Sequence, residues 1–174
     1  MNKKKLEESI IKQLNSDDFG DIMEGIKEIR EKGNYLYIKE LTKVLRTNTT
    51  IEVQREISEL LNDIHNNEAV PAIMNEIKLD LNKEILHILV SSCWQSPLDY
   101  SNYFSDFVDL ALEGDYLCTI EAISVIENIL MNFEIESLTI SNQLFKIKKG
   151  IEEVSADKQL LILELKKILQ EKKG

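Results

Sequence analysis

The chain has few of the residues that build disulfide frameworks, loop-rich folds or metal sites. Its 174 residues include two cysteines, two histidines, two prolines and six glycines. Two cysteines are too few for a disulfide framework, and this usage is typical of a reducing compartment. Two isolated histidines without further ligands at metal-binding spacing do not make a zinc site. We therefore expect no metal and no other cofactor.

Long apolar runs are also missing. The uncharged apolar stretches fall far short of the roughly 20 residues that a membrane-spanning helix needs. The N-terminal segment MNKKKLEESIIKQL has the lysines of a signal peptide, but charged residues interrupt its apolar part. We expect a cytoplasmic protein with no membrane partner. A hydrophobic fraction of 43% is enough to build the core of a single domain.

Sequence motifs of common enzymes are missing too. The chain contains no glycine-rich phosphate loop, no GxSxG and no HExxH. Cys93 follows a serine, but no basic residue lies near it in sequence to lower its pKa, and nearby carboxylates would raise it. A buried structural cysteine explains this position better than a nucleophile. We therefore interpret the chain as a protein without catalytic residues.

Basic residues are absent from residues 84–145, a stretch of 62 residues. The acids of this stretch are Glu84, Asp99, Asp106, Asp109, Glu113, Asp115, Glu121, Glu127, Glu134 and Glu136. The whole chain has a net charge of −10, and the remaining residues balance 21 acids against 21 lysines and arginines. This charge would repel DNA or RNA, so we expect no nucleic-acid partner and favour a protein with a basic surface.

Apolar residues recur at helical spacing along most of the chain, and no segment alternates with period two. The sequence therefore predicts an all-α protein. The expected helices span residues 3–14, 21–32 (closed by Gly33), 35–46, 50–66, 69–79, 82 or 83 to about 93, 103–113 (closed by Gly114), 115–131, 137–149 (closed by Gly150) and 155–170.

The clearest helical pattern lies in residues 50–78. Val53, Ile57 and Leu61 line one face of a helix for which Thr50 is the expected N-cap. Pro71 lies in the first turn of the next helix, where its missing N–H costs little. Residues 37–45 match residues 69–77 at an offset of 32, and residues 103–111 continue the series at an offset of 34. Such an offset indicates repeated helix pairs, which bury their apolar faces by stacking.

The segments EVQREISELLNDI and NNEAVPAIMNEI resemble the HEAT-repeat pattern, in which the second helix of one repeat is followed by the opening of the next. The resemblance implies one domain over residues 1–174, a right-handed α-solenoid of about five antiparallel helix pairs. The repeats are clearest over residues 35–131, and residues 137–170 form a C-terminal helix pair. The resemblance further implies a concave face that binds proteins, and it transfers no catalytic residue.

Aromatic residues cluster within the segment that lacks basic residues, and six of them lie between residues 94 and 116. Aromatic rings beside carboxylates suit an arginine- or lysine-bearing partner, through cation–π contacts and charged hydrogen bonds. The candidate partner-binding residues are Trp94, Asp99, Tyr100, Tyr103, Asp106, Asp109 and Glu113. The alternative is that Phe104 and Phe107 fill the core, that Trp94 fills an irregular join between repeats, and that the carboxylates form a solvated face.

Asp106, Asp109 and Glu113 share one face of the helix expected over residues 103–113. Like charges at this spacing repel by a few tenths of a kcal/mol per pair, and Glu113 also meets the negative end of the helix dipole. A basic partner would relieve both effects. The last helix, residues 155–170, has a wide apolar stripe that either packs on the preceding helix or docks onto a second copy of the chain or a partner.

The leading hypothesis is a HEAT-like scaffold or adaptor that binds a basic protein. One alternative is an antitoxin or immunity protein that inhibits a basic enzyme by acidic mimicry of nucleic acid. A second alternative resembles the HEAT-fold alkylpurine DNA glycosylases, but these need a basic groove, whereas acids surround Trp94 here.

Overall fold

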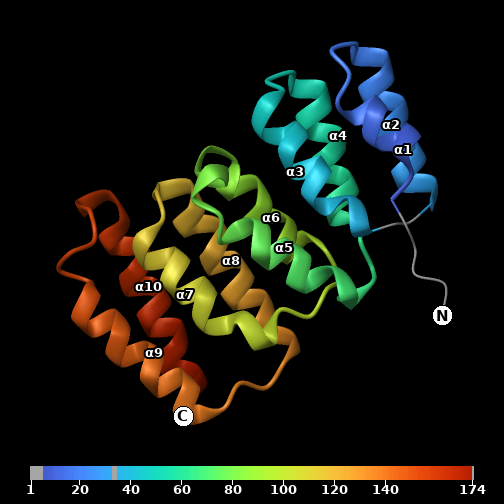
Figure 1. Ribbon diagram of the computed structural model, residues 1–174. Helices are drawn as coiled ribbons and strands as arrows, with labels where there is room; N and C mark the ends of the chain where they lie inside the picture. The colour runs from blue at the N-terminus through green and yellow to red at the C-terminus, as the bar shows by residue number, and fades with distance from the viewer. Residues whose placement is uncertain (1–5, 33–34, 174) are drawn as a thin grey trace. The chain divides into compact units, whose positions relative to one another are not determined.

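The structure is a computed structural model that describes residues 6–32 and 35–173 (Figure 1). Ten α-helices and four short 3₁₀-helices form its regular structure, and no β-strand occurs among these residues. The prediction of an all-α protein is confirmed. Within the same residues, no helix is both long enough and apolar enough to cross a membrane.

The α-helices alternate with short connections, four of which contain a 3₁₀-helix. The α-helices are α1 (Glu8–Leu14), α2 (Phe19–Lys32), α3 (Ile38–Thr47), α4 (Ile51–Asn62), α5 (Val70–Ile77), α6 (Leu86–Gln95), α7 (Phe104–Glu113), α8 (Tyr116–Asn132), α9 (Ser137–Gly150) and α10 (Ala156–Lys173). The 3₁₀-helices are η1 (Tyr35–Tyr37), η2 (Asn67–Ala69), η3 (Asp80–Ile85) and η4 (Ser101–Tyr103).

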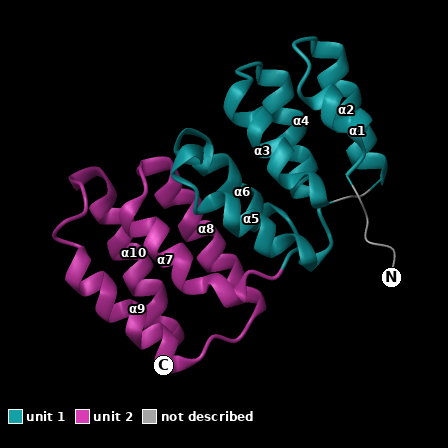
Figure 2. Ribbon diagram, in the orientation of Figure 1, with its two compact units in different colours: residues 1–98 teal, residues 99–174 magenta. Residues whose placement is uncertain are grey.

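The described residues form two compact units that divide between Leu98 and Asp99 (Figure 2). Unit 1 contains α1 to α6, and unit 2 contains α7 to α10. The prediction of one domain over residues 1–174 stays a prediction. The division matters for function because it separates Trp94, in unit 1, from the other candidate binding residues.

Unit 1 is built from three consecutive helix pairs. The two helices of each pair pack together, α1 with α2, α3 with α4 and α5 with α6. The first helices of the pairs also pack in order, α1 on α3 and α3 on α5, and the second helices do the same, α2 on α4 and α4 on α6. The predicted apolar face of α4 is confirmed, because Val53, Ile57 and Leu61 expose at most 1% of their surface.

Unit 2 repeats this arrangement with two pairs. Helix α7 packs with α8, and α9 packs with α10. Across the pairs, α7 packs on α9 and α8 packs on α10. The apolar stripe of α10 is buried at Ile162, Leu165 and Leu169, which are fully covered, whereas Leu160 and Leu163 expose 77% and 47% of their surface. The stripe is therefore wider than the surface that its neighbours cover.

Several predicted helix ends differ from the structure. The helices expected from residues 35, 82 or 83, and 103 begin with η1, η3 and η4 before they become α-helical, because a 3₁₀ turn is a common way to start a helix. Thr50 is the N-cap of α4 as predicted, but its side chain makes no capping hydrogen bond. Pro71 lies in the first turn of α5, as predicted.

The three glycines that were expected to end helices have different outcomes. Gly33 lies outside the described residues. Gly150 is the last residue of α9, and Ile151 is the C-cap, so the expected end is one residue early. Gly114 is the C-cap of α7 as predicted, with φ −65° and ψ 171°. The reason for glycine is steric, because a Cβ atom there would lie 2.6 Å from the Leu110 carbonyl oxygen and 2.8 Å from Cys118 Sγ.

Candidate functional site

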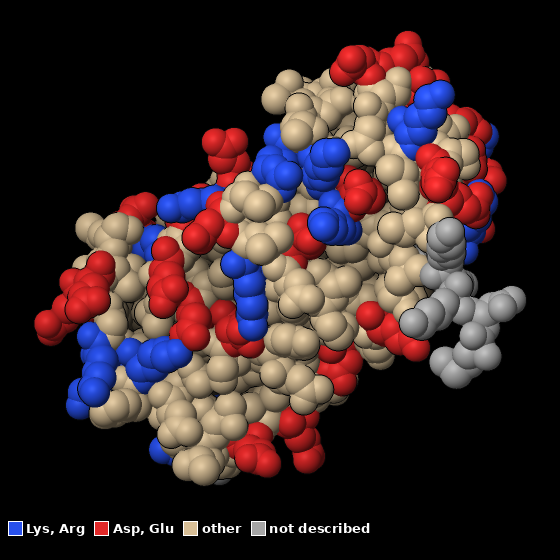
Figure 3. All heavy atoms as spheres, viewed as in Figure 1, with Lys and Arg blue, Asp and Glu red and all other residues tan. Residues whose placement is uncertain are grey.

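Of the ten acids in the segment without basic residues, Glu84 lies in η3 of unit 1, and the other nine lie in unit 2, before or within α7, next to or within α8, and in the connection between α8 and α9. On the face drawn in Figure 3, carboxylates and basic groups form small groups that are separated by uncharged surface. That face carries no single continuous acidic patch. The predicted binding residues therefore have to be placed one at a time.

Two of these residues, Asp99 and Tyr100, lie in the segment that leads into α7. Asp99 is half-buried, and its Oδ1 accepts a hydrogen bond from the backbone N–H of Ser101 at 2.8 Å. Tyr100 exposes only 1% of its surface, and its ring meets Phe107 edge to face, with 5.9 Å between ring centroids. Tyr100 and Phe107 therefore contribute to the core, as the alternative reading of the aromatic cluster proposed.

Tyr103 and Trp94 retain accessible surface. Tyr103 is half-buried at the end of η4, next to the start of α7. Trp94 lies near the end of α6 in unit 1 and exposes 39% of its surface. Tyr103 belongs to the same unit as the α7 carboxylates, whereas Trp94 belongs to the other unit and has to be tested separately.

The carboxylates of α7 do not form one uniform charged row. Asp109 forms an ion pair with Lys146 of α9, next to a hydrogen bond from Gln143 Nε2 to Ser105 Oγ of 2.9 Å. Asp106 is half-buried, and Glu113 is exposed at the last position of the helix. We had expected a partner to supply the counter-charge for these residues. For Asp109 the chain itself supplies it, from a lysine 37 residues away.

Two lysines of α10 contact the ends of α7 and α8, helices that contain no lysine or arginine of their own. Lys158 exposes 5% of its surface, and its Nζ donates hydrogen bonds to the carbonyl oxygens of Leu112 at 2.9 Å and Gly114 at 2.5 Å. Lys172 Nζ donates to the Leu130 carbonyl oxygen at 2.9 Å. Both lysines satisfy carbonyl groups at helix C-termini, where the helix dipole favours a cation.

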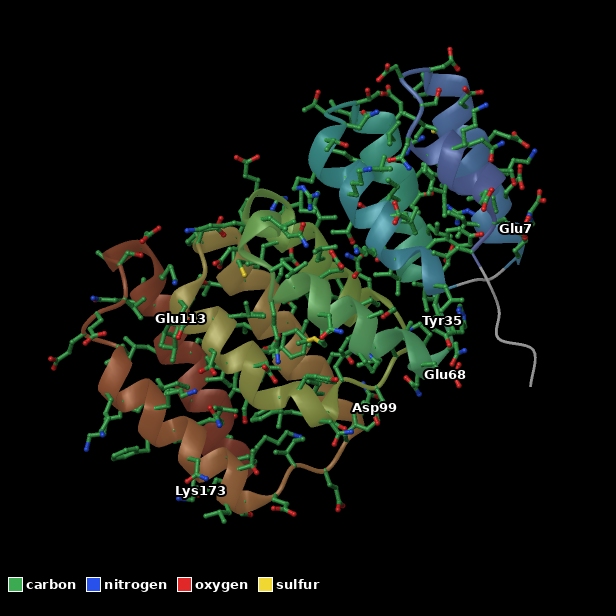
Figure 4. The ribbon with its side chains drawn as sticks, in the orientation of Figure 1. Glu7, Tyr35, Glu68, Asp99, Glu113 and Lys173 are labelled. Atoms are coloured by element: carbon green, nitrogen blue, oxygen red, sulfur yellow. The ribbon has the colours of Figure 1, made fainter. Side chains whose placement is uncertain are left out.

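The C-terminal end of α7 therefore has a buried lysine bound to its carbonyl groups. Figure 4 labels Asp99 near one end of the helix and Glu113 at the other. The ten residues of α7 span about 15 Å, at a rise of about 1.5 Å per residue. Lys158 compensates the C-terminal end, near Glu113. The exposed Glu113 and Asp115 still place negative charge beside that end, and the half-buried Asp99 and Asp106 place it near the N-terminal end.

A hollow of about 330 Å³ lies at this N-terminal end, and we call it the acidic hollow. Its lining residues are Ser101, Asn102, Phe104 and Ser105 from η4 and α7, and Glu134, Ile135, Glu136 and Thr139 from the α8–α9 connection and α9. Glu134 and Glu136 are exposed, and none of the lining residues is basic. Two carboxylates beside hydroxyl and amide groups can bind an ammonium or guanidinium group through charged hydrogen bonds.

Sequence reasoning did not single out Glu134 and Glu136 as a site. They had been counted among the ten acids of the segment, but nothing local connects them to Ser101 and Ser105, more than 25 positions earlier in the chain. The packing of α7 on α8 and on α9 brings the two segments together. A polar connection between two long helices, rich in carboxylates, was the only available signal.

Cys93 and Cys118 are both buried, and they form no disulfide. Burial, together with a smaller effect of the nearby Asp115 carboxylate, raises the pKa of the Cys118 thiol to about 11. The thiol is therefore protonated near neutral pH and is a poor nucleophile. Cys118 also fills the space beside Gly114, consistent with the structural role expected for a buried cysteine.

The chain was compared with family models, curated proteins and solved structures, and nothing in these comparisons matches it. The resemblance to HEAT repeats therefore stays a prediction that rests on the residues of this chain.

Proposed function

We propose that the chain is a HEAT-like helical-repeat scaffold without catalytic activity, which binds a basic protein partner at the acidic hollow. Within each unit, the packing of first helices on first helices and of second helices on second helices supports stacked repeats. In this proposal the five helix pairs form one right-handed solenoid, and the protein acts in the cytoplasm.

Hydrogen bonds between neighbouring pairs support the same proposal. In unit 1, Arg30 pairs with Asp63, and Asn62 Nδ2 donates to Gln95 Oε1 at 3.0 Å. Both contacts join residues 33 positions apart. In unit 2, Gln143 contacts Ser105 across 38 positions. The separation of 33 in unit 1 is close to the offsets of 32 and 34 in the sequence, as a repeat of one helix pair produces, and the separation in unit 2 is longer.

The observation that carries the binding proposal is the acidic hollow itself. Glu134 and Glu136 are exposed beside it, and its wall presents the side chains of Ser101, Ser105 and Thr139. A lysine or arginine side chain that enters the hollow meets carboxylates without a competing cation among the lining residues. Such charged contacts at an accessible rim give specificity and a salt-dependent association rate.

A scaffold fits these features better than an inhibitor that mimics nucleic acid. A mimic of DNA or RNA needs carboxylates at regular spacing over a continuous surface. Here Lys146 neutralises Asp109, and Lys158 occupies the C-terminal end of α7. The exposed Glu113 and Asp115 lie apart from the acidic hollow, and the two carboxylates that line the hollow suit the binding of one or two basic side chains.

The proposal is tested by recovery of partners from the native lysate at low and moderate salt, with identification by mass spectrometry. The double variant Glu134→Gln, Glu136→Gln removes two charges with little change in volume. The double variant Glu152→Gln, Glu153→Gln is the matched control, because it removes two exposed charges from the connection between α9 and α10 of the same unit.

We expect the parent chain and the control variant to recover a basic protein at low salt and to lose it as the salt concentration rises. The Glu134→Gln, Glu136→Gln variant should not recover this protein. Far-ultraviolet circular dichroism should be the same for all three proteins. Equal recovery by both variants would contradict the assignment of the acidic hollow. Neutral substitutions are preferable to lysine on α7, because a lysine at Asp109 would face Lys146 and disturb the fold.

A further inference from the structure

Unit 1 contains a second hollow, of about 400 Å³, at the C-terminal ends of α2 and α4 and the start of α3. We call it the unit 1 hollow. Its apolar wall consists of Ile29, Ile38, Leu41, Leu60 and Ile64. The first four are nearly covered by the core, and Ile64 is half-buried, so an entering group would mainly contact Ile64 and the edge of the core. A volume of this size is within the range of small-ligand sites.

The polar groups at the mouth are already engaged with one another. Arg30 pairs with Asp63 and lies 3.5 Å from Glu56 Oε2. The Tyr35 hydroxyl donates to Glu68 Oε2 at 2.7 Å, and these two labelled side chains lie next to each other in Figure 4. The hydrogen bond to Glu68 raises the pKa of Tyr35. An entering group therefore finds an apolar interior and a rim whose guanidinium is already paired.

The rim is negatively charged overall. Asp63 and Arg30 line the hollow together with His65. Two further carboxylates lie behind the lining residues, Glu56 against Arg30 and Glu68 against Tyr35, and Arg55 pairs with Glu56 at 3.4 Å. The C-terminal ends of α2 and α4 add the negative ends of two helix dipoles. An anion would be disfavoured here, whereas a cation beside an apolar group would satisfy both the interior and the rim.

We propose that the unit 1 hollow binds an amphipathic cation, in which a phenyl ring or branched alkyl group lies against the apolar wall and an adjacent ammonium or guanidinium group faces Asp63 and Glu68. This chemistry is shared by a free organic amine and by an apolar side chain next to a lysine or arginine in a peptide. The site is separate from the acidic hollow, so either can fail without the other.

The test uses the full chain and three probes of the same size and different charge: phenethylammonium, 2-phenylethanol and phenylacetate. Binding is followed through the methyl NMR signals of Ile38 and Ile64 and by calorimetry. We expect saturable shifts with phenethylammonium, weaker binding of the alcohol and the weakest binding of the acid. Absence of saturable shifts, or acid binding as tight as the ammonium, would overturn the proposal.

Two variants and a control locate the site. Ile64→Phe fills the hollow and should weaken binding of phenethylammonium at least tenfold, whereas Ile51→Phe places the same ring at a position that is 77% exposed and should leave it unchanged. Glu68→Gln keeps an acceptor for Tyr35 and should remove most of the preference for the ammonium over the alcohol. Unchanged binding to Ile64→Phe would refute the location, and melting temperatures would show that the variants fold.

A last arm distinguishes the two sources of the ligand. The dipeptide acetyl-Phe-Lys-amide presents the same groups as phenethylammonium on a peptide backbone. Binding of the dipeptide at least tenfold more tightly than phenethylammonium would assign the hollow to a protein partner. Tighter binding of the free amine would assign it to a small molecule, and both results would support an amphipathic cation as the ligand class.

Discussion

Replacement of Lys158 by methionine tests whether the buried ammonium group stabilises the end of α7. Methionine keeps an unbranched apolar chain of similar length but removes both hydrogen bonds, to Leu112 and Gly114. A hydrogen bond from a charged group contributes about 1.5 to 3 kcal/mol, and a carbonyl left without a partner costs about 1 to 3 kcal/mol. Removal of the cost of burying an ammonium offsets part of this loss.

We therefore expect Lys158→Met to lower the free energy of unfolding by about 2 to 3 kcal/mol. The measurement is urea denaturation of the full chain followed by circular dichroism. Lys167→Met is the matched control on the same helix, because Lys167 is 64% exposed and forms only an i,i+3 ion pair with Glu164. Its expected effect is within about 0.5 kcal/mol. Equal losses for the two variants would refute the capping role of Lys158.

Three further predictions follow from particular residues. Gly114→Ala should lower the free energy of unfolding by about 1 to 3 kcal/mol, because the new Cβ atom would overlap Leu110 and Cys118. At Gly150 a Cβ atom would have no contact closer than 3.8 Å, so Gly150→Ala should be neutral or stabilising in the same denaturation assay. The Cys118 thiol should resist alkylation at pH 7.5 until the protein unfolds. Because folding raises the pKa of this thiol, the free energy of unfolding should fall as the pH rises from about 9 to 11. The Cys118→Ala variant should lose less unfolding free energy over that pH range than the parent chain. A homodimer formed through the exposed leucines of α10 should become a monomer in the Leu160→Glu variant. The measurement is light scattering coupled to size-exclusion chromatography, and a parent chain that is monomeric at high concentration would exclude this dimer.

The helices could be predicted from the sequence because their signals are local. The stripe of Val53, Ile57 and Leu61 is buried as the spacing indicated, and Pro71 lies in a first turn. These features depend on residues three or four positions apart, or on the backbone limits of a single residue. Errors are confined to helix ends, where a 3₁₀ turn and an α turn have nearly the same sequence preferences.

For the candidate site, the sequence predicted only that it would be rich in acidic residues and would lack basic ones. The absence of basic residues over 84–145 is a property of the sequence, but the positions of lysines from α9 and α10 are not. Lys146 reaches Asp109 across 37 positions, and Lys158 reaches Gly114 across 44. Packing of helix pairs selects these contacts, and no local pattern encodes them.

The amino-acid sequence by itself determined an all-α chain, the positions of its helices and an excess of negative charge in its middle. The tertiary structure alone decided that Tyr100 belongs to the core, that Trp94 lies in a different unit from the other candidates, and that Glu134 and Glu136 meet the start of α7 at one hollow. The physical reason is that hydrophobic periodicity specifies which face of each helix is buried, whereas the choice of neighbouring helix depends on side-chain packing between segments far apart in the chain.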